Sequence, residues 1–503
     1  MEKYYFSFDA GTQSVKVAVY DAAMRCVAKA SNPTTLQYPH PGWVEMDADE
    51  YLQLTKQGMK QCIEQLKATG IDPGLIKAIM GDGIICGIVG IDEKGRAITP
   101  YINYLDSRTQ ADAETLKELQ LDIWRQETGN AEPLCMFPAM HARWLLANHK
   151  GFQAHGRKFV HNAPYILLNL AGLSSSAAFI DWGTMSGWGL GYRVYEKEWS
   201  AQQLDVLGIH PDYMPQIIKP WDIIGTLSPE AAAEIGCPSG IPICAGAGDT
   251  MQSMLGSGVF EANKAVDVAG TCAMFCVSTN GIIPELSRKG SGLIFNSGTL
   301  PNTYFYWGFV RTGGLALRWF KDSICQKATD DGYYAFLSEA AASVPPGCQD
   351  VLFLPYLTGG YDEYASIKGC FLNMNLDTDQ FVLWRSVLEA IAYDYREITD
   401  TYRHAGIDIN RITITEGGSR DALWNQIKAD VLNTEAITLE ISGGAVLTNS
   451  ILAAYATGTI ADLPGALAGN LKTAQIYAPN PLNAPLYKKQ YQRQKELLKK
   501  LGN

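Results

Sequence analysis

Two short apolar segments at the amino terminus flank a polar turn. Residues 3–8 are rich in aromatic side chains and predict a buried strand, and residues 15–20 predict its antiparallel partner. The connection between them reads Asp9-Ala10-Gly11-Thr12-Gln13-Ser14 and consists largely of turn-forming residues. The pattern therefore predicts a β-hairpin with a polar turn at its tip.

Strand and helix patterns alternate through the rest of the amino-terminal half. Strands are predicted at 26–29, 75–84 and 88–92, and an amphipathic helix at 51–69. The remaining predictions are mostly helical structure at 110–150, a small-residue loop near a ligand at 174–195, a helix at 199–207 and a strand at 241–248. This mixed order predicts an α/β domain whose sheet is covered by helices.

The carboxyl-terminal half repeats the opening pattern. A strand predicted at 264–269 leads into a turn, and Asp267-Val268-Ala269-Gly270-Thr271 is similar in composition to the first turn. The pattern then predicts a long helix at 388–402, a strand at 411–415, a glycine turn at 416–419, and helices at 422–432 and 487–500. We therefore expect a weak internal duplication, with a boundary within 248–261 and domains at 1–250 and 251–503.

Composition narrows the classes of function. Hydrophobic residues make up 47% of the 503 residues and charged residues 18%, which is typical of a globular protein. The net charge of −11, with no compensating basic stretch, argues against nucleic acid or a membrane surface as a partner. No signal pattern or long apolar run is present, so we expect a cytoplasmic protein whose eleven cysteines are reduced.

The first turn has the chemistry of a phosphate site. Gly11 lets the backbone approach an anion closely, Thr12 and Ser14 offer hydroxyl donors, and Lys16 adds positive charge. Asp9 could hold a divalent metal through water. The alternative is an ordinary turn, because the same residue types are common in turns. Neither a P-loop nor a complete dinucleotide fingerprint occurs in the chain.

Seven segments together resemble the FGGY family of carbohydrate kinases, which share the duplicated fold of actin, hexokinase and the chaperone ATPases. They are FDAGTQSVK (8–16), YLDSR (104–108), AGAGDT (245–250), AGT (269–271), RTGGLALRW (311–319), LPYLTGG (354–360) and EGGSRDALWNQIKAD (416–430). The resemblance implies an α/β protein of two ribonuclease H-like domains with a cleft between them.

The resemblance also implies a role for individual residues. Asp249 matches the catalytic base and Asp9 the carboxylate associated with Mg²⁺. The implied ATP-binding residues are Gly11, Thr12, Gln13, Ser14, Lys16, Gly270, Thr271, Gly313, Gly314, Gly417 and Gly418. The implied substrate-side residues are Asp106, Arg108 and Thr250. The alternative for Asp249 is a helix N-cap, since residues 250–255 could begin a helix.

Some positions depart from the family pattern. Ile84-Ile85-Cys86 stands where relatives carry polar side chains that bind substrate hydroxyls. Either the hydroxyls are read elsewhere, with Asp82, Asp181 and Trp182 as candidates, or the substrate differs from those of the pentulose and glycerol kinases. Glu416 replaces the first glycine of a triplet, and Thr448-Asn449-Ser450 replaces a trio of small residues. His141 stands where the family has a lysine, and a structural role is the simpler interpretation.

We therefore expect an ATP- and Mg²⁺-dependent kinase that phosphorylates a terminal hydroxyl of a small sugar or polyol, with D-xylulose as the first candidate. Glycerol, a tetritol or a sugar acid are alternative substrates. A nucleotide-binding switch or a sugar-sensing regulator of the same fold is the alternative function, and an actin-like filament protein is disfavoured by the motif at Asp106 and Arg108. We expect no nucleic-acid or membrane partner, and a homodimer is compatible with the sequence.

Overall fold

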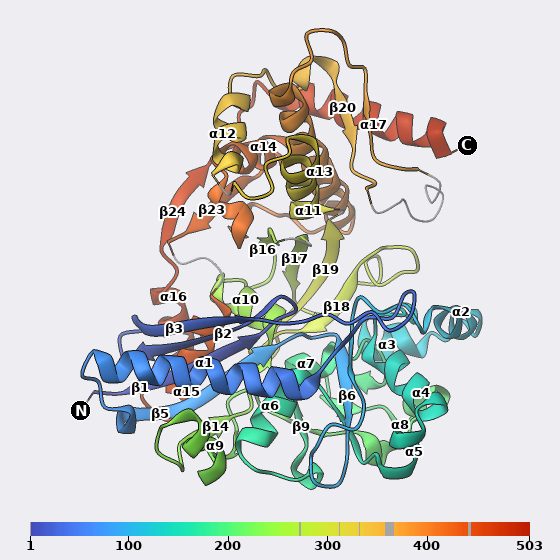
Figure 1. Cartoon of the computed structure of the whole chain (residues 1–503). Coiled ribbons are helices and arrows are strands. Elements are labelled where there is room, and N and C mark those ends of the chain that lie inside the picture. Colours follow the sequence, from blue (N-terminus) through green and yellow to red (C-terminus); the bar gives the residue numbers. More distant parts are fainter. Residues whose placement is uncertain are drawn as a thin grey trace.

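The computed structural model describes residues 2–270, 273–310, 312–330, 332–357, 367–440 and 444–502. Within them the chain forms two α/β halves, each built around a seven-stranded sheet (Figure 1). The amino-terminal half occupies the lower part of the view, and the helices and strands of the carboxyl-terminal half lie mainly above it. The predicted two-domain α/β fold is confirmed.

The amino-terminal sheet is built on the predicted hairpin. β1 (Tyr4–Ala10) pairs antiparallel with β2 (Ser14–Asp21), which pairs with β3 (Cys26–Pro33). On its other side β1 runs parallel to β5 (Ile76–Gly83), and β5 also pairs with β14 (Pro242–Cys244) and β15 (Ala247–Gly248). β13 (Ile223–Thr226) forms the edge. The hairpin thus lies next to parallel strands whose carboxyl ends share one edge.

Two helices bury this sheet from opposite faces. Phe6 and Phe8 of β1 belong to the hydrophobic cluster that includes α1 (Ala48–Ala68), whereas Tyr5 belongs to the cluster that includes α15 (Ala445–Ala456). Alternate residues of a strand point to opposite faces of the sheet. Because a helix covers each face, every residue of β1 is buried. Helix α15 therefore connects the late part of the chain to the first strand.

The carboxyl-terminal sheet repeats this arrangement and confirms the predicted duplication. β16 (Ala265–Val268) pairs antiparallel with β17 (Ala273–Thr279) and runs parallel to β22 (Arg411–Thr415). The other strands are β18 (Ile294–Ser297), β19 (Tyr304–Val310), β23 (Glu435–Leu439) and β24 (Thr473–Tyr477). Helices α13 (Gln380–His404), α14 (Ala422–Leu432) and α17 (Ala484–Gly502) pack on this half.

The segment 174–195 differs from the predicted loop. It forms β9 (Phe179–Asp181), α7 (Trp182–Ser186) and β10 (Tyr192–Arg193), and most of it is buried. The prediction was wrong because the small residues serve close packing: a Cβ atom on Gly189 would lie 2.1 Å from the Phe137 ring.

A four-stranded sheet, three two-stranded sheets and further helices make up most of the remaining described chain. The two-stranded sheets pair β9 with β12 (Gln216–Ile218), β10 with β11 (Glu198–Trp199), and β20 (Leu352–Leu354) with β21 (Cys370–Leu372). The four-stranded sheet contains β4 (Glu45–Met46), β7 (Tyr101–Asn103), β6 (Gly87–Ile91) and β8 (Lys158–Val160). The helices are α2 (Gln110–Glu118), α3 (Ile123–Thr128), α4 (Pro138–Asn148), α5 (Lys150–His155), α6 (Asn162–Leu170), α8 (Ala201–Leu207), α9 (Pro229–Ile235), α10 (Asp249–Gly256), α11 (Gly313–Trp319), α12 (Tyr333–Ala341) and α16 (Leu463–Gly469).

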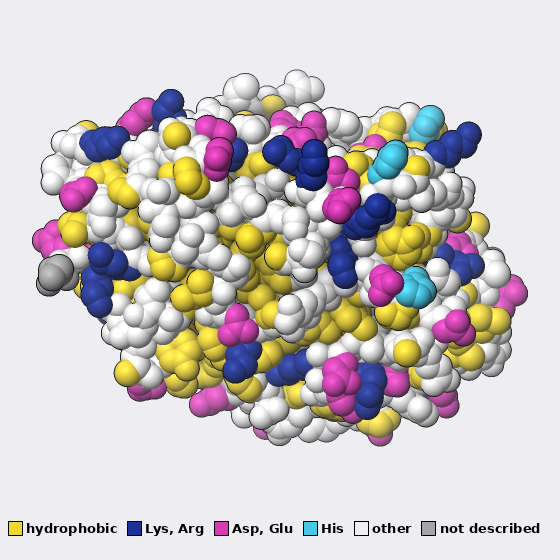
Figure 2. Space-filling view, turned by 90° about the horizontal axis from the view of Figure 1, so that it is seen from below, with side chains coloured by type: hydrophobic (Ala, Val, Ile, Leu, Met, Phe, Trp, Pro, Cys, Tyr) yellow, Lys and Arg dark blue, Asp and Glu magenta, His cyan; other side chains and the backbone are white. Residues whose placement is uncertain are grey.

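The surface is mixed in character on the side shown in Figure 2. Acidic and basic side chains lie interspersed there, with hydrophobic side chains between them. Such a mixture is usual for a protein surface. Among the described residues, no helix combines the length and the apolar character needed to cross a bilayer.

Candidate active site

Three strand ends bring three aspartates together. Asp9 at the end of β1 lies opposite Asp82 of β5, and Ala247 and Gly248 of β15 lie opposite Asp82 and Gly83. Asp249 follows directly as the first residue of α10. Residues 9, 82 and 249 therefore converge because the carboxyl ends of parallel strands meet at one edge of a sheet. We call Asp9, Asp82 and Asp249 the carboxylate cluster.

The carboxylate cluster is incompletely neutralised by the protein. Oδ1 of Asp9 and Oδ1 of Asp82 are buried and have no hydrogen-bond partner among the described residues. Nζ of Lys16 lies 3.4 Å from Oδ2 of Asp9, and the charge of Asp9 raises the pKa of Lys16. Burial, together with the negative charge of Asp9, raises the pKa of Asp249 to about 7. Burial and the charges of Asp9 and Asp249 likewise raise the pKa of Asp82 well above its ordinary value. The protein alone therefore does not favour ionisation of all three carboxyl groups, and a bound cation would favour it.

These oxygens fit a hard divalent cation such as Mg²⁺. Carboxylate oxygens are its preferred protein ligands, and it is usually held by one or two of them together with water and phosphate. Within the described part of the chain, no group of three or more acidic, cysteine or histidine side chains is arranged to hold a metal alone. A cation at this site would therefore need further ligands from water or a bound substrate.

Helix α10 fixes the position of Asp249. Its N-cap residue is Gly248, so the alternative assignment of Asp249 as the N-cap is wrong. Oδ1 of Asp249 accepts hydrogen bonds from the backbone N–H of Thr250 at 2.6 Å and from the Thr250 hydroxyl at 3.2 Å. The carboxylate is therefore held in one orientation by its neighbour, and Thr250 lies beside the predicted base.

The tip of the first hairpin is fixed from within the amino-terminal sheet. The N–H of Gly11 donates to the carbonyl of Ser14 at 3.1 Å. Thr34 donates its backbone N–H to the carbonyl of Gln13 and its hydroxyl to the carbonyl of Thr12. These contacts use the carbonyl groups of the turn. Phosphate binding by this turn stays a prediction.

The structure brings the predicted nucleotide-side glycines together at the end of β16. The N–H of Gly314 donates to the carbonyl of Gly270, and the N–H of Gly418 donates to the carbonyl of Ala269. A Cβ atom on Gly418 would lie 2.5 Å from the Ala269 side chain, and one on Gly313 would lie 2.8 Å from the backbone nitrogen of Ala273. Close backbone packing thus requires glycine at both positions. Gly417 begins the short turn that contains Gly418, and Thr271 lies outside the described residues.

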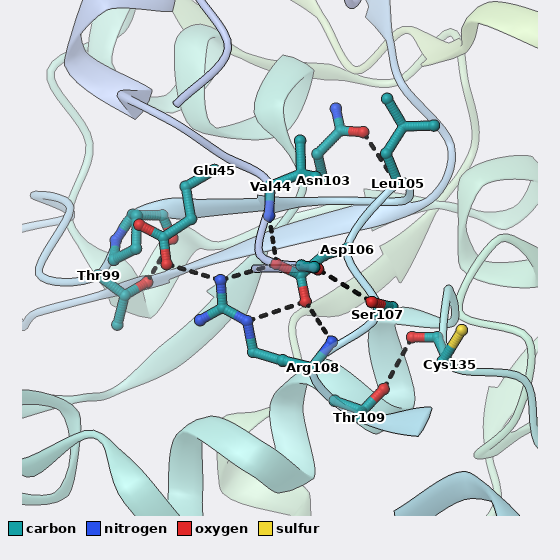
Figure 3. Close-up of polar contacts among 12 residues, drawn as sticks. Val44, Glu45, Thr99, Asn103, Leu105, Asp106, Ser107, Arg108, Thr109 and Cys135 are labelled. Carbon is teal, nitrogen blue, oxygen red and sulfur yellow. Dashed lines mark hydrogen bonds and ion pairs between the residues drawn. The ribbon is translucent and has the colours of Figure 1, made fainter. Parts of the chain in front are cut away.

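Asp106 and Arg108 form a buried pair in the turn after β7 (Figure 3). The guanidinium donates to both oxygens of Asp106 and to Glu45, and the N–H of Val44 also donates to Asp106. Its centre lies 3.8 Å from the centroid of the Trp43 ring. A direct sugar contact would compete with these internal bonds, so the predicted substrate contact stays a prediction.

Two residues at the carboxylate cluster escaped the sequence-based assignment of the site. Asp82 appeared only among the substitutes for hydroxyl-binding groups, and Asn449 only as a departure from the family. Nδ2 of Asn449 donates to Oδ2 of Asp82 at 2.6 Å and to the carbonyl of Phe8 at 3.0 Å. The signal for Asp82 was a charged residue between two glycines at the end of an apolar strand. Its partner lies 367 positions away, beyond any local pattern.

Comparison with known proteins is consistent with this geometry. The models for the N-terminal and C-terminal domains of the FGGY family of carbohydrate kinases match residues 4–256 and 265–457. A xylulose kinase of Staphylococcus epidermidis is 24% identical over 485 residues, which cover 96% of this chain and 94% of that protein. A gluconokinase of Bacillus subtilis is 25% identical over 472 residues, covering 92% and 89%.

A solved structure with a third named substrate shares the fold. The glycerol kinase of Plasmodium falciparum, determined with ADP, superposes with a TM-score of 0.88 at 18% identity, covering 99% of this chain and 98% of that one. The three similar proteins named here act on different sugars or polyols by name, so similarity supports the chemistry more strongly than the substrate.

Proposed function

The chain belongs to the FGGY family of carbohydrate kinases, which use ATP as phosphate donor, and we propose that it phosphorylates a terminal hydroxyl of a pentulose. D-xylulose is the first candidate, because the similar protein from Staphylococcus epidermidis is named a xylulose kinase. The gluconokinase and glycerol kinase relatives make a sugar acid and glycerol the next candidates.

The observation that carries the proposal is the position of Asp249 directly after the carboxyl end of β15, beside Asp9 and Asp82. The substrate oxygen attacks the γ-phosphorus of ATP, its proton passes to the Asp249 carboxylate, and the bond to the bridging oxygen breaks to release ADP. An acceptor with a pKa of about 7 suits this transfer, because general bases work best near the operating pH. Thr250 would keep the carboxylate oriented toward the hydroxyl.

The remaining site residues position and neutralise the phosphates. Asp9 would hold Mg²⁺, which when bound neutralises charge on the transferring oxygens. Gly11, Thr12, Gln13, Ser14 and Lys16 would cradle phosphate oxygens from the amino-terminal half. Gly270, Thr271, Gly313, Gly314, Gly417 and Gly418 would line the nucleotide from the other half. The backbone hydrogen bonds from Gly314 to Gly270 and from Gly418 to Ala269 bring these glycines together at the end of β16, which is compatible with one shared ligand.

Asp106 and Arg108 would act on the sugar side by holding the turn after β7. Their mutual pairing and the contact of Arg108 with Trp43 support a positioning role. We also propose a domain boundary within 248–261, supported by family models that end at 256 and resume at 265. A cytoplasmic location and a homodimer remain predictions.

The proposal is tested by ADP release with ATP and Mg²⁺ over a panel of D-xylulose, other pentuloses, tetritols, glycerol and gluconate. One member should stimulate release, and Asp249→Asn should lose at least about 10²-fold, the usual contribution of a general base. Asp92→Asn is the matched control, because its carboxylate only accepts backbone N–H groups in a surface turn. Failure of the whole panel, or full activity in Asp249→Asn, would contradict the proposal.

A further inference from the structure

Residues 84–86, which lie beside Asp249, carry no hydroxyl, amide or charged side chain. Ile84, Ile85 and Cys86 are all buried, and the Cys86 thiol donates to the carbonyl of Gly187 at 3.4 Å. A Cβ atom on Gly248 would lie 2.2 Å from Cγ2 of Ile85. This segment therefore packs directly against the residue that precedes the proposed base, where a sugar would need hydrogen-bonding groups.

Unpartnered polar atoms surround the same segment. The Tyr101 hydroxyl, Nδ1 of His161 and Nε1 of Trp188 are buried, and none has a hydrogen-bond partner among the described residues. Nε2 of His161 lies 3.1 Å from the carbonyl of Ile85, and the His161 and Trp188 rings are 6.1 Å apart. A buried hydroxyl without a partner costs about 1–3 kcal/mol, so a bound polar molecule is the natural complement.

Tyr101 lies between the segment 84–86 and the first hairpin. Its strand β7 pairs with β6, and a Cβ atom on Gly87 would lie 2.4 Å from the Tyr101 hydroxyl oxygen. The Tyr101 ring packs edge-on against Tyr51 at 5.9 Å, and the Tyr51 hydroxyl donates to the carbonyl of Gly11 at 3.2 Å. The phenol is thus placed on the side of the proposed phosphate turn.

The phenol is also within electrostatic reach of the base. Burial raises the pKa of the Tyr101 hydroxyl well above its ordinary value, and the negative charge of Asp249 adds to this effect. The group therefore stays neutral and keeps both a donor and an acceptor for a ligand hydroxyl.

We infer that Tyr101 is a specificity-determining residue whose hydroxyl binds a hydroxyl of the sugar substrate. This inference rests on the proposed function and adds a contact to the same site. It answers how a chain with Ile84-Ile85-Cys86 recognises a polyhydroxylated molecule: the contact comes from the neighbouring strand β7. The ligand class is a small sugar or polyol in neutral form.

The test compares Tyr101→Phe with Tyr5→Phe. Both tyrosines are fully buried, but the Tyr5 hydroxyl is satisfied by Thr459 at 2.6 Å. The KM for D-xylulose, or for the panel sugar that the wild type uses best, should rise about tenfold in Tyr101→Phe, the effect of one lost hydrogen bond. The unfolding temperature without sugar should not fall, because the variant removes an unpaired hydroxyl.

Tyr5→Phe should behave in the opposite way, with an unchanged KM and a lower unfolding temperature. An unchanged KM in Tyr101→Phe, or an unfolding temperature that falls as it does in Tyr5→Phe, overturns the inference and leaves the kinase proposal intact. A wild-type protein that none of the panel sugars stimulates overturns the proposed function, and the inference with it.

Discussion

The two halves of the molecule share a hairpin flanked by a parallel strand, but the aspartates near the ends of β1 and β16 have different surroundings. Asp9 has one buried oxygen without a partner in the described chain, and half of the side chain of its ion-pair partner Lys16 is exposed. Asp267 accepts a hydrogen bond from Tyr395 and forms a buried ion pair with Lys428 at 2.6 Å.

This difference separates a structural carboxylate from one available for ligands. The protein supplies hydrogen-bond and ion-pair partners for Asp267 from its own side chains. Asp267 is therefore part of the structure of the carboxyl-terminal sheet. The carboxylate cluster at the other hairpin is left short of partners, which is unfavourable for folding and consistent with the proposed binding of a cation and phosphate there. Duplication of the fold has therefore not duplicated the chemistry.

The largest expected effect comes from removing the cation that pairs with Asp267. Lys428→Met should lower the free energy of unfolding by about 3–5 kcal/mol, because it leaves Asp267 charged and buried without its cation. Lys16→Met is the matched control and should lower it by no more than about 1 kcal/mol, since Lys16 is half exposed. Denaturant unfolding measures both. Equal losses would show that the two hairpins do not differ in this way.

The next effect is the pH dependence of catalysis. Asp249 accepts a proton only when ionised, and burial raises its pKa to about 7. The value of kcat/KM should therefore rise with pH and level off above about pH 8, with roughly a tenfold loss at pH 6. Steady-state rates between pH 5.5 and 9 measure the profile. A flat profile across pH 7 would contradict the assignment of Asp249 as the base.

The smallest effect concerns the glycine turn at 416–419, where the charge of Glu416 acts on Lys16 of the first hairpin. Glu416 has φ 61° and ψ −160°, a conformation that glycine adopts far more easily. Glu416→Gly should raise the free energy of unfolding by about 1 kcal/mol. Glu416→Ala removes the carboxylate but retains the strain, so it should give no such gain. Equal stabilisation by alanine would assign the effect to charge.

Local patterns predicted much of this architecture. The hairpin and the helix at 422–432 follow from apolar runs bounded by turn residues, which are properties of neighbouring positions. The strand predicted at 241–248 is divided into β14 and β15. The segment 174–195 was predicted incorrectly, because small polar residues are typical of loops as well as of tight packing. The Asp82–Asn449 bond joins distant positions, and Tyr101 was indistinguishable from a core tyrosine until its hydroxyl was seen without a partner.

The central claim is that the carboxylate cluster is unfavourable for folding because it is organised for catalysis. For a carboxyl whose pKa is raised in the folded state, the folded protein binds more protons than the unfolded chain between the two pKa values. Stability therefore falls as pH rises from about 3.9 to the folded value near 7. Replacing Asp249 with a neutral isostere removes this loss, which is complete above pH 7.

The decisive measurement is therefore the unfolding temperature and the rate of sugar-stimulated ADP release at pH 8, on the same samples of wild type and Asp249→Asn. The account predicts that the variant unfolds at a higher temperature and loses at least about 10²-fold in rate. A variant that unfolds at a lower temperature, or that retains the wild-type rate, would contradict it.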